Sequence, residues 1–169
     1  MKKVLVSLVL VLSLLFLSGC SSNATTSSSS YGTSSGNQKT EYGMNQDIYI
    51  KNSSGEYRLK ITGIRETADR NEFSDTVANR VIIISYEYEN ISQEDDLYIS
   101  DYDFKVYDKS GTILETYPVS YKYPDSISSG RRTTAEAAYA LNNNENYIEL
   151  EYYDNMFNSK PDCLIKVQW

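Results

Sequence analysis

The amino-acid sequence predicts an all-β domain, an antiparallel sandwich or barrel of about eight strands, preceded by a disordered tether. Three observations predict this fold class. Apolar and polar residues alternate in short runs, which is typical of strands with one dry face and one wet face. Turn residues separate these runs at intervals of about 10 to 20 residues. No segment has the apolar spacing of an amphipathic helix of three turns.

The expected strands follow one another from residue 47 to the end of the chain. The strongest covers residues 81–90, where Ile82 and Tyr86 lie on one apolar face and Val81 indicates burial of the opposite face as well. We interpret residues 66–78 as a loop. The complete set of expected strands is 47–51, 58–64, 81–90, 101–107, 112–117, 133–141, 148–152 and 163–169.

The sequence in the middle of the domain, residues 101–117, predicts a hairpin. In residues 101–107, Tyr102, Phe104 and Val106 alternate with polar residues and should share one buried face. Residues 108–111 end in a glycine that can take a positive φ, so they predict a turn. Residues 112–117 should then form the returning strand, which ends before a proline.

The first 19 residues have the features of a secretory signal. Two lysines are followed by an apolar run of about 14 residues, which is shorter than the ~20 needed for a membrane span. Residues 17–20, Leu-Ser-Gly-Cys, resemble the lipobox of bacterial lipoproteins. That resemblance implies cleavage after Gly19 and a diacylglyceryl group on Cys20, and the alternative is an ordinary signal peptide with a chance cysteine.

Residues 20–41 form the expected lipidated cysteine and flexible linker. Residues 21–40 contain eight serines and four threonines, so they cannot bury enough apolar surface to offset the entropy of ordering them. A coil of this length reaches roughly 25 Å, which would lift the domain of residues 42–169 off the lipid. A glycosylated or wall-threading stretch is the alternative.

Several segments of the domain resemble a family of bacterial extracytoplasmic lipoproteins of unknown function. They are residues 42–45, the Leu-Lys-Ile-Thr strand at 59–62, the run at 81–90, residues 103–111 and Ser129-Gly130 before an alanine-rich strand. The resemblance implies an immunoglobulin-like β-sandwich over residues 42–169. Some relatives carry a telomeric repeat-binding label, which conflicts with the charge of this chain.

The charge and composition exclude several classes of function. Removal of residues 1–19, which include two lysines, leaves 14 basic and 23 acidic residues, a formal charge of −9. This balance argues against binding nucleic acid through its phosphates. Because the chain has no histidine, it cannot use Ser-His-Asp or Cys-His catalysis. We therefore expect no cofactor, and its two cysteines rule out a disulfide framework.

The candidate sites fall into four groups. Cys20 is the expected lipidation site, and Cys163 should be a buried, inert thiol because it alternates with apolar residues. A tyrosine-rich loop followed by two arginines predicts a binding patch; its members are Tyr117, Tyr121, Tyr123, Arg131 and Arg132. The alternative is a proline-pinned loop whose tyrosines pack on the sandwich.

Two acidic clusters are weaker candidates. Carboxylates are the ligands that calcium prefers, but neither cluster has the spacing of a known calcium loop, so both are expected to be solvated loops. The calcium candidates are Asp95, Asp96, Asp101 and Asp103, next to Glu94, and the other cluster contains Asp69, Glu72 and Asp75. Two such carboxylates could also form a glycosidase pair if they lay across a cleft.

These observations predict a non-enzymatic binding module that is lipid-anchored on the extracytoplasmic face of a bacterial cell membrane. The expected partners are the membrane itself, through the lipid, and an envelope protein or cell-wall component, with no nucleic acid. Two alternatives stay open at this point. One is an enzyme that acts on cell-wall glycan through paired carboxylates, and the other is a structural domain without a ligand.

Overall fold

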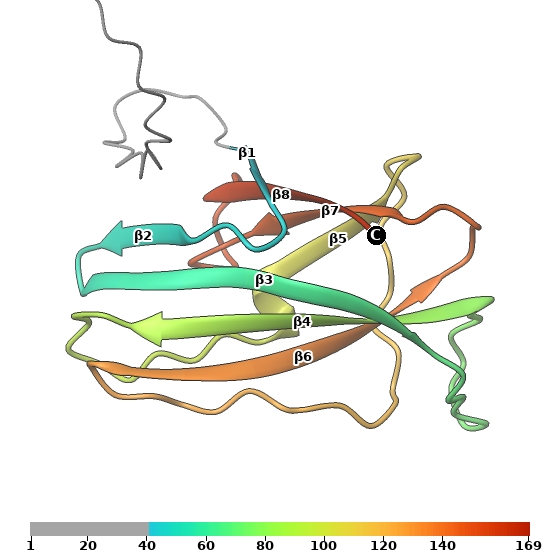
Figure 1. Cartoon of the computed structure of the whole chain (residues 1–169), viewed down its shortest axis with the longest axis horizontal. Coiled ribbons are helices and arrows are strands. Elements are labelled where there is room, and N and C mark those ends of the chain that lie inside the picture. The colour runs from blue at the N-terminus through green and yellow to red at the C-terminus, as the bar shows by residue number, and fades with distance from the viewer. Residues whose placement is uncertain (1–40) are drawn as a thin grey trace, which may run out of the picture. The chain divides into compact units, whose positions relative to one another are not determined.

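The computed structural model describes residues 41–169, which form eight strands and one short 3-10 helix (Figure 1). The predicted signal segment 1–19, Cys20 and nearly all of the predicted linker lie outside the described residues. The elements are β1 (Glu41–Gly43), β2 (Ile48–Asn52), β3 (Gly55–Thr67), β4 (Arg80–Asn90), η1 (Asp101–Asp103), β5 (Phe104–Asp108), β6 (Arg131–Leu141), β7 (Tyr147–Tyr152) and β8 (Cys163–Gln168).

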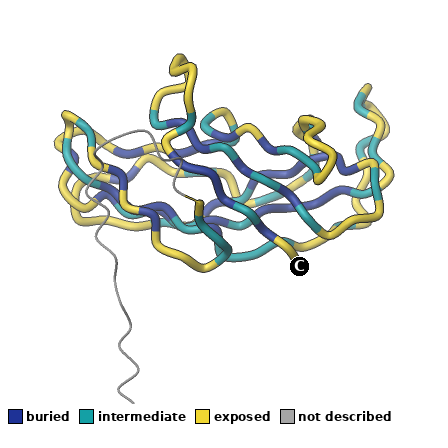
Figure 2. Tube along the Cα trace, turned by 90° about the horizontal axis from the view of Figure 1, so that it is seen from above, coloured by how far each residue is buried: buried dark blue, intermediate teal, exposed yellow. Residues whose placement is uncertain are grey.

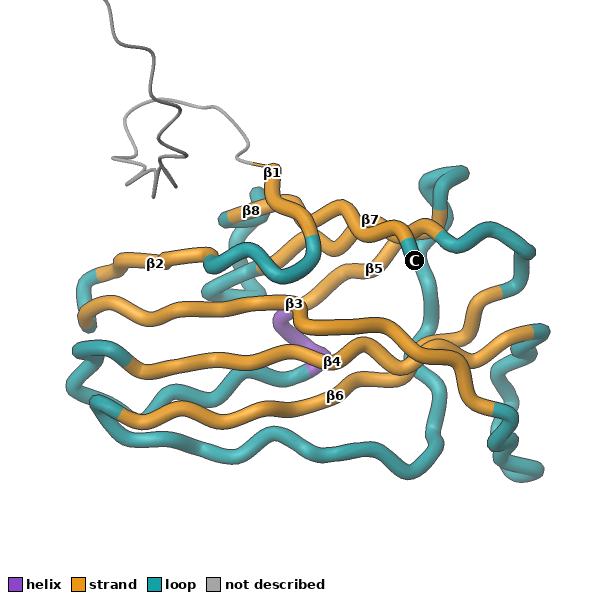
Figure 3. Tube along the Cα trace, viewed as in Figure 1, coloured by secondary structure: helices purple, strands orange, loops and turns teal. Residues whose placement is uncertain are grey.

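The strands make two four-stranded sheets that lie face to face (Figure 3). One sheet has the order β2-β3-β4-β6, and the other has the order β1-β8-β7-β5. Every pair of neighbours is antiparallel except β1 and β8, which are parallel. The prediction of an all-β sandwich of about eight strands is therefore confirmed.

The core lies between the sheets, because alternate residues of each strand point inward. On β4, Ile82, Ile84, Tyr86 and Tyr88 are buried in this core, as their alternation predicted. Figure 2 shows the buried positions along the strands and the exposed ones in the loops. Val81 points to the other face of the same strand and is also buried, so both faces of β4 are covered where it begins.

The β2–β3 hairpin depends on a glycine. Gly55 has a φ of +139°, which L side chains rarely adopt. A Cβ at this position would also lie 2.5 Å from the carbonyl oxygen of Ser92. The absence of a side chain therefore lets the hairpin pack against the loop that follows β4.

The prediction that residues 112–117 form a returning strand is wrong, because this segment is not a regular strand. The segment makes only isolated pairings, Tyr107 with Ile113 and Thr116 with Tyr139. It first bonds to β5, where Leu114 N donates to Val106 O at 2.7 Å. It then crosses to β6 and runs along its free edge (Figure 1), which closes one side of the sandwich.

The predicted strand at residues 101–107 begins later than expected. Residues 101–103 form η1, because the side chain of Ser100 and that of Asp103 each bond to the other's backbone in a capping box. This turn places Tyr102 at the surface, 76% exposed, and not on the buried face with Phe104. The prediction of a loop at 66–78 is confirmed from residue 68 onward, since β3 ends at Thr67.

Within residues 41–169, no helix is long and apolar enough to span a bilayer.

Candidate functional site

Four tyrosines gather on two loops beside the free edge of β6. This tyrosine patch consists of Tyr98, Tyr102, Tyr121 and Tyr123; Tyr121 is half-buried and the other three are 54%, 76% and 67% exposed, respectively. Tyr98 and Tyr102 come from the segment between β4 and β5, and Tyr121 and Tyr123 come from the segment between β5 and β6. The two segments are joined by a pair of backbone hydrogen bonds between Leu97 and Ile127, at 2.8 and 2.9 Å.

Buried side chains of β4 hold these loops from inside. The hydroxyl of Tyr86 donates to the carbonyl oxygen of Ile99 at 3.0 Å. The hydroxyl of Tyr88 donates to the carbonyl oxygen of Asp125 at 2.5 Å and accepts from its N–H at 3.0 Å. Core residues therefore fix the backbone on which the exposed tyrosines stand, so the surface is organised before a ligand arrives.

Pairing with β6 brings two of the rings together. Lys122 lies between Tyr121 and Tyr123, and its N–H and carbonyl oxygen both bond to Glu136, its N–H at 3.1 Å to the carboxylate and its oxygen at 2.8 Å to the backbone N–H. The Lys122 ammonium reaches Thr134 Oγ1 at 2.7 Å. The rings of Tyr121 and Tyr123 lie 4.8 Å apart between centroids, tilted by 45°.

One carboxylate, Asp101, lies within electrostatic range of the patch. Burial raises the pKa of Tyr121, and the charge of Asp101 and the hydroxyls of Tyr123, Tyr102 and Tyr98 raise it further. A further tyrosine, Tyr139, has a buried hydroxyl with no hydrogen-bond partner among the described residues. Burial raises the pKa of Tyr139, and Asp101 and Tyr121 add to that increase, so its hydroxyl lies within electrostatic range of the patch.

The predicted patch is only partly assembled by the structure. Tyr121 and Tyr123 lie together at the surface, but the inclusion of Tyr117 is wrong. Tyr117 is buried against Val81 on the outer face of the sheet, and its hydroxyl accepts a bond from Asn71 N at 3.2 Å.

The two arginines of the predicted patch make no polar or ring contact with the tyrosine patch within residues 41–169. Arg131 and Arg132 are exposed at the start of β6, opposite Asn90 and Glu89 in the ladder. Nothing in the described part of the chain joins either arginine to the four tyrosines by a hydrogen bond, an ion pair or a ring contact. We therefore leave them out of the candidate site.

An acidic hollow of about 560 Å³ adjoins the patch and shares Tyr98 with it. Its carboxylates come from Asp95, Asp96, Asp103 and Asp154, and its other side chains include Tyr152, Met156 and Phe157. Burial raises the pKa of Asp103, against the opposing effect of hydrogen bonds from Ser100, and the charges of Asp101 and Asp154 add to the increase.

The predicted calcium candidates do not assemble into a coordination shell. Asp95, Asp96 and Asp103 line the hollow but Asp101 does not. Residues 41–169 contain no group of three or more acidic or cysteine side chains arranged to hold a metal ion. Of the other acidic cluster, Asp69 and Glu72 line a separate open hollow of about 500 Å³.

A polar chain connects the acidic hollow to the core. The Tyr57 hydroxyl donates to Asp154 at 2.5 Å and lies 2.8 Å from the hydroxyl of Tyr152. Asn52 Nδ2 also donates to Asp154, at 2.9 Å. The Asp154 carboxylate is thus already hydrogen-bonded, which fixes it in place as one wall of the hollow.

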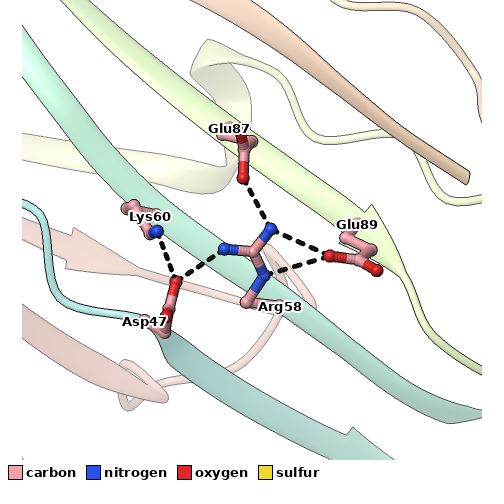
Figure 4. A network of polar contacts seen from close by, with 5 residues as sticks. All are labelled: Asp47, Arg58, Lys60, Glu87 and Glu89. Atoms are coloured by element: carbon pink, nitrogen blue, oxygen red, sulfur yellow. Dashed lines mark hydrogen bonds and ion pairs between the residues drawn. The ribbon is translucent and has the colours of Figure 1, made fainter.

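A second charged network lies on the outer face of the β2-β3-β4-β6 sheet (Figure 4). Arg58 is 9% exposed and donates to Asp47 at 2.6 Å, to Glu87 at 2.5 Å and to Glu89 at 2.8 Å. Lys60 also reaches Asp47, at 2.7 Å. The Arg58 guanidinium already bonds to three carboxylates, so we interpret this network as a clamp that ties β3 to β4 and to the residue before β2, and not as a binding site.

Cys163 is buried, as predicted. Burial and the neighbouring charge of Asp162 raise the pKa of its thiol to about 12. The thiolate, which is the reactive form, is therefore scarce at neutral pH. This supports the prediction that Cys163 is inert.

Comparison with solved structures supports the fold alone, because all identities are low. The secreted protein MPT63 from Mycobacterium tuberculosis matches with a TM-score of 0.58 and 8% identity, over 78% of this chain and 98% of that protein. The Bacillus subtilis protein ycdA, designated a candidate lipoprotein, matches with a TM-score of 0.56 and 14% identity, over 73% of this chain but only 39% of its own. The Bacillus subtilis protein yjhA matches with a TM-score of 0.51 and 16% identity, over 75% of this chain and 98% of its own.

Comparison of the sequence with curated proteins gives no significant match. A family model described as a domain of unknown function, DUF5067, matches residues 32–154. This range covers most of the chain and includes every tyrosine of the patch. The chain therefore belongs to the DUF5067 family.

Proposed function

We propose that this protein is a non-enzymatic binding module, anchored by a lipid on Cys20 to the extracytoplasmic face of a bacterial cell membrane, and that it contacts an envelope ligand through the tyrosine patch. The observation that carries the proposal is the gathering of Tyr98, Tyr102, Tyr121 and Tyr123 on loops held by the core.

Tyrosine is well suited to recognition. Its ring offers a large contact area, its hydroxyl can bond at the rim, and only two side-chain torsions must be ordered. Loops positioned by a rigid scaffold carry binding residues more often than the scaffold itself. Here the hydrogen bonds from Tyr86 and Tyr88 supply that rigidity.

The proposed anchor rests on the sequence, and the descriptions of proteins with a similar fold agree with it. A basic start, a short apolar run and Leu-Ser-Gly-Cys occur in order at the right spacing. Each acyl CH₂ buried in a bilayer contributes about 0.8 kcal/mol, and two chains are enough for stable anchoring. Proteins of similar fold are described as secreted or as a candidate lipoprotein, which agrees with an extracytoplasmic location.

Photo-crosslinking on living cells tests the patch. The full-length lipoprotein is compared with a variant carrying Tyr121→Ala and Tyr123→Ala, and with the control Tyr49→Ala, which removes a ring of similar exposure on β2. We expect the double variant to lose its crosslinked envelope partner while its melting temperature stays the same. Unchanged capture by the double variant would reject the patch.

Metabolic labelling with palmitate tests the anchor. The wild-type protein and a Cys163→Ala variant should incorporate the label, since the buried thiol is not the acceptor. Cys20→Ala should lose both the label and membrane association. A protein that stays in the membrane fraction after Cys20→Ala would contradict the anchor.

A second candidate function is hydrolysis of a wall glycan, favoured by the four carboxylates that line one hollow and by the raised pKa of Asp103. A glycosidase needs one protonated and one ionised carboxyl group. Release of soluble fragments from purified cell wall, abolished by Asp103→Asn, would support this candidate over the binding module.

A further inference from the structure

The tyrosine patch contains a carboxylate without a counter-charge. Asp101, in η1, lies within electrostatic range of Tyr121, and its side chain makes no hydrogen bond or ion pair with the rest of residues 41–169. Some carboxylates of the described surface are paired, as Asp47 is with Arg58 and Lys60, and others such as Asp75 are not, so what distinguishes Asp101 is its place beside the tyrosines. The charge of Asp101 is therefore available to a ligand.

A second unsatisfied group is buried near the patch. Tyr139 is 2% exposed, and its hydroxyl is a buried polar atom without a partner. Leaving such a group unbonded costs about 1–3 kcal/mol. It lies within electrostatic range of Asp101 and Tyr121, so it adds an unbonded polar group to the surroundings of the patch.

Among residues 41–169, no lysine or arginine forms an ion pair or a ring contact with the patch. Lys122, the nearest lysine in sequence, turns its ammonium to Thr134 Oγ1. The adjoining hollow adds the carboxylates of Asp95, Asp96 and Asp103, and its lining contains no lysine or arginine among the described residues. A surface lined by one sign of charge concentrates ions of the opposite sign.

We propose that the tyrosine patch, together with Asp101 and the acidic hollow beside it, binds a small organic cation through an ammonium group. The π-faces of tyrosine rings attract cations, and aromatic cages recognise quaternary ammonium groups in this way. The tilted pair Tyr121 and Tyr123 supplies two such faces, and Tyr98 and Tyr102 supply two more. This inference rests on the proposed binding function and names its ligand class.

Charge separates this ligand from others that tyrosines accept. A neutral sugar would gain nothing from Asp101 and the hollow, and a phosphate would be repelled by them. An ammonium group gains from both the carboxylate and the rings. A ligand of the same shape without the charge is therefore the most informative probe.

Choline and its neutral isostere 3,3-dimethylbutan-1-ol form such a pair. Saturation-transfer NMR of the ligand methyl groups is run on the full lipidated protein in a non-ionic detergent at constant ionic strength. We expect choline to bind saturably and the neutral alcohol to bind about tenfold more weakly or not at all. Equal binding of the two, or no saturable choline signal, would overturn the inference.

Matched variants locate the site. Asp101→Asn and the pair Tyr121→Leu with Tyr123→Leu should each weaken choline binding about tenfold, while the same pair changed to Phe should keep binding within about twofold because the ring faces remain. Asp75→Asn and Tyr49→Leu remove an exposed carboxylate and an exposed ring elsewhere, and should bind as the wild type does. Choline binding that survives both patch variants would place the cation elsewhere and overturn the inference.

The two proposals fail separately. If crosslinking to an envelope partner depends on Tyr121 and Tyr123 but choline does not bind, the ammonium inference falls and the binding module stands. If choline binds the patch but crosslinking is unchanged in the alanine double variant, the inference stands and the proposed partner contact falls.

Discussion

Replacement of Arg58 by methionine should destabilise the domain more than any change in its other surface ion pairs. Arg58 reaches three carboxylates with distances of 2.5 to 2.8 Å, and its side chain is 11% exposed. Methionine keeps the aliphatic contacts and removes the charge. Glu87 and Glu89 would then lose the cation that they share, and only Lys60 and Arg132 would lie opposite them in the ladders.

The expected cost follows from how far the partners are buried. Removal of one partner from a fully buried ion pair costs about 3–5 kcal/mol, and an exposed pair contributes at most about 1 kcal/mol. The carboxylates here are 25% to 39% exposed, so water partly solvates them once the cation is lost. We therefore expect a loss of about 2–3 kcal/mol in the free energy of unfolding.

Urea unfolding at pH 7 measures this loss, and Arg65→Met is the matched control. Arg65 lies on the same strand and pairs with Glu136 at 3.2 Å, but its side chain is 51% exposed. The control should cost less than about 1 kcal/mol. Equal costs for the two variants would show that the Arg58 network contributes no more than an ordinary surface pair.

The pH dependence gives an independent check. Burial opposes ionisation of Asp47, but hydrogen bonds from Lys60 and Arg58 outweigh it and lower its pKa. A carboxyl group with a lowered folded-state pKa contributes stability above its unfolded pKa of about 4, and the contribution is lost as the pH falls through the folded value. The difference between wild type and Arg58→Met should therefore be full at pH 7 and shrink below about pH 4.

Three further predictions follow from the packing. Gly55→Ala should lower the free energy of unfolding by at least about 2 kcal/mol, because it combines an unfavourable φ with a 2.5 Å contact. Gly111→Ala, at a φ of +84° with open space around it, should lower it by about 1 kcal/mol. Equal melting temperatures of the two variants would contradict this. Tyr57→Phe should cost about 1–3 kcal/mol in chemical unfolding, since Asp154 loses its 2.5 Å bond, and no change would mean that water replaces the hydroxyl. Cys163 should resist alkylation in the native protein and react at the rate of global unfolding; rapid modification would show local opening of β8.

The long strands could be predicted from the sequence because each one is amphipathic with a period of two. Residues 148–152 were expected as a strand and β7 is Tyr147–Tyr152, with Ile148, Leu150 and Tyr152 buried. One dry face is enough to fix such a pattern locally. The alternation of these residues therefore identified both the strand and its buried face.

Elements that depend on distant partners could not be predicted from local alternation. β1 is three residues long and pairs in parallel with β8 at the other end of the chain. Residues 112–117 alternate like a strand, but their first half bonds to β5 and their second half to β6, so no ladder continues through them. Local alternation cannot distinguish one strand from a crossing between two sheets.

The candidate site was half predictable for the same reason. Tyr121 and Tyr123 are neighbours in sequence, so their exposure in one loop could be inferred, whereas Tyr98 joins them only because Leu97 pairs with Ile127. The sequence around Tyr98 did contain a local signal. Tyr98 lies between two apolar residues, Leu97 and Ile99, which are both buried, so alternation along an extended segment directs Tyr98 to the surface.

The remaining part of the site comes from the core itself. Tyr86, Tyr88 and Tyr139 are buried in the core, yet each keeps a hydroxyl at the loop side of the core. Two of those hydroxyls hold the loops and the third has no partner. Phenylalanine would fill the same volume, so packing alone does not account for tyrosine at these three positions. A polar tip at the end of a core ring is useful only if the backbone or ligand above it must be held, which links the composition of β4 and β6 to the surface they support.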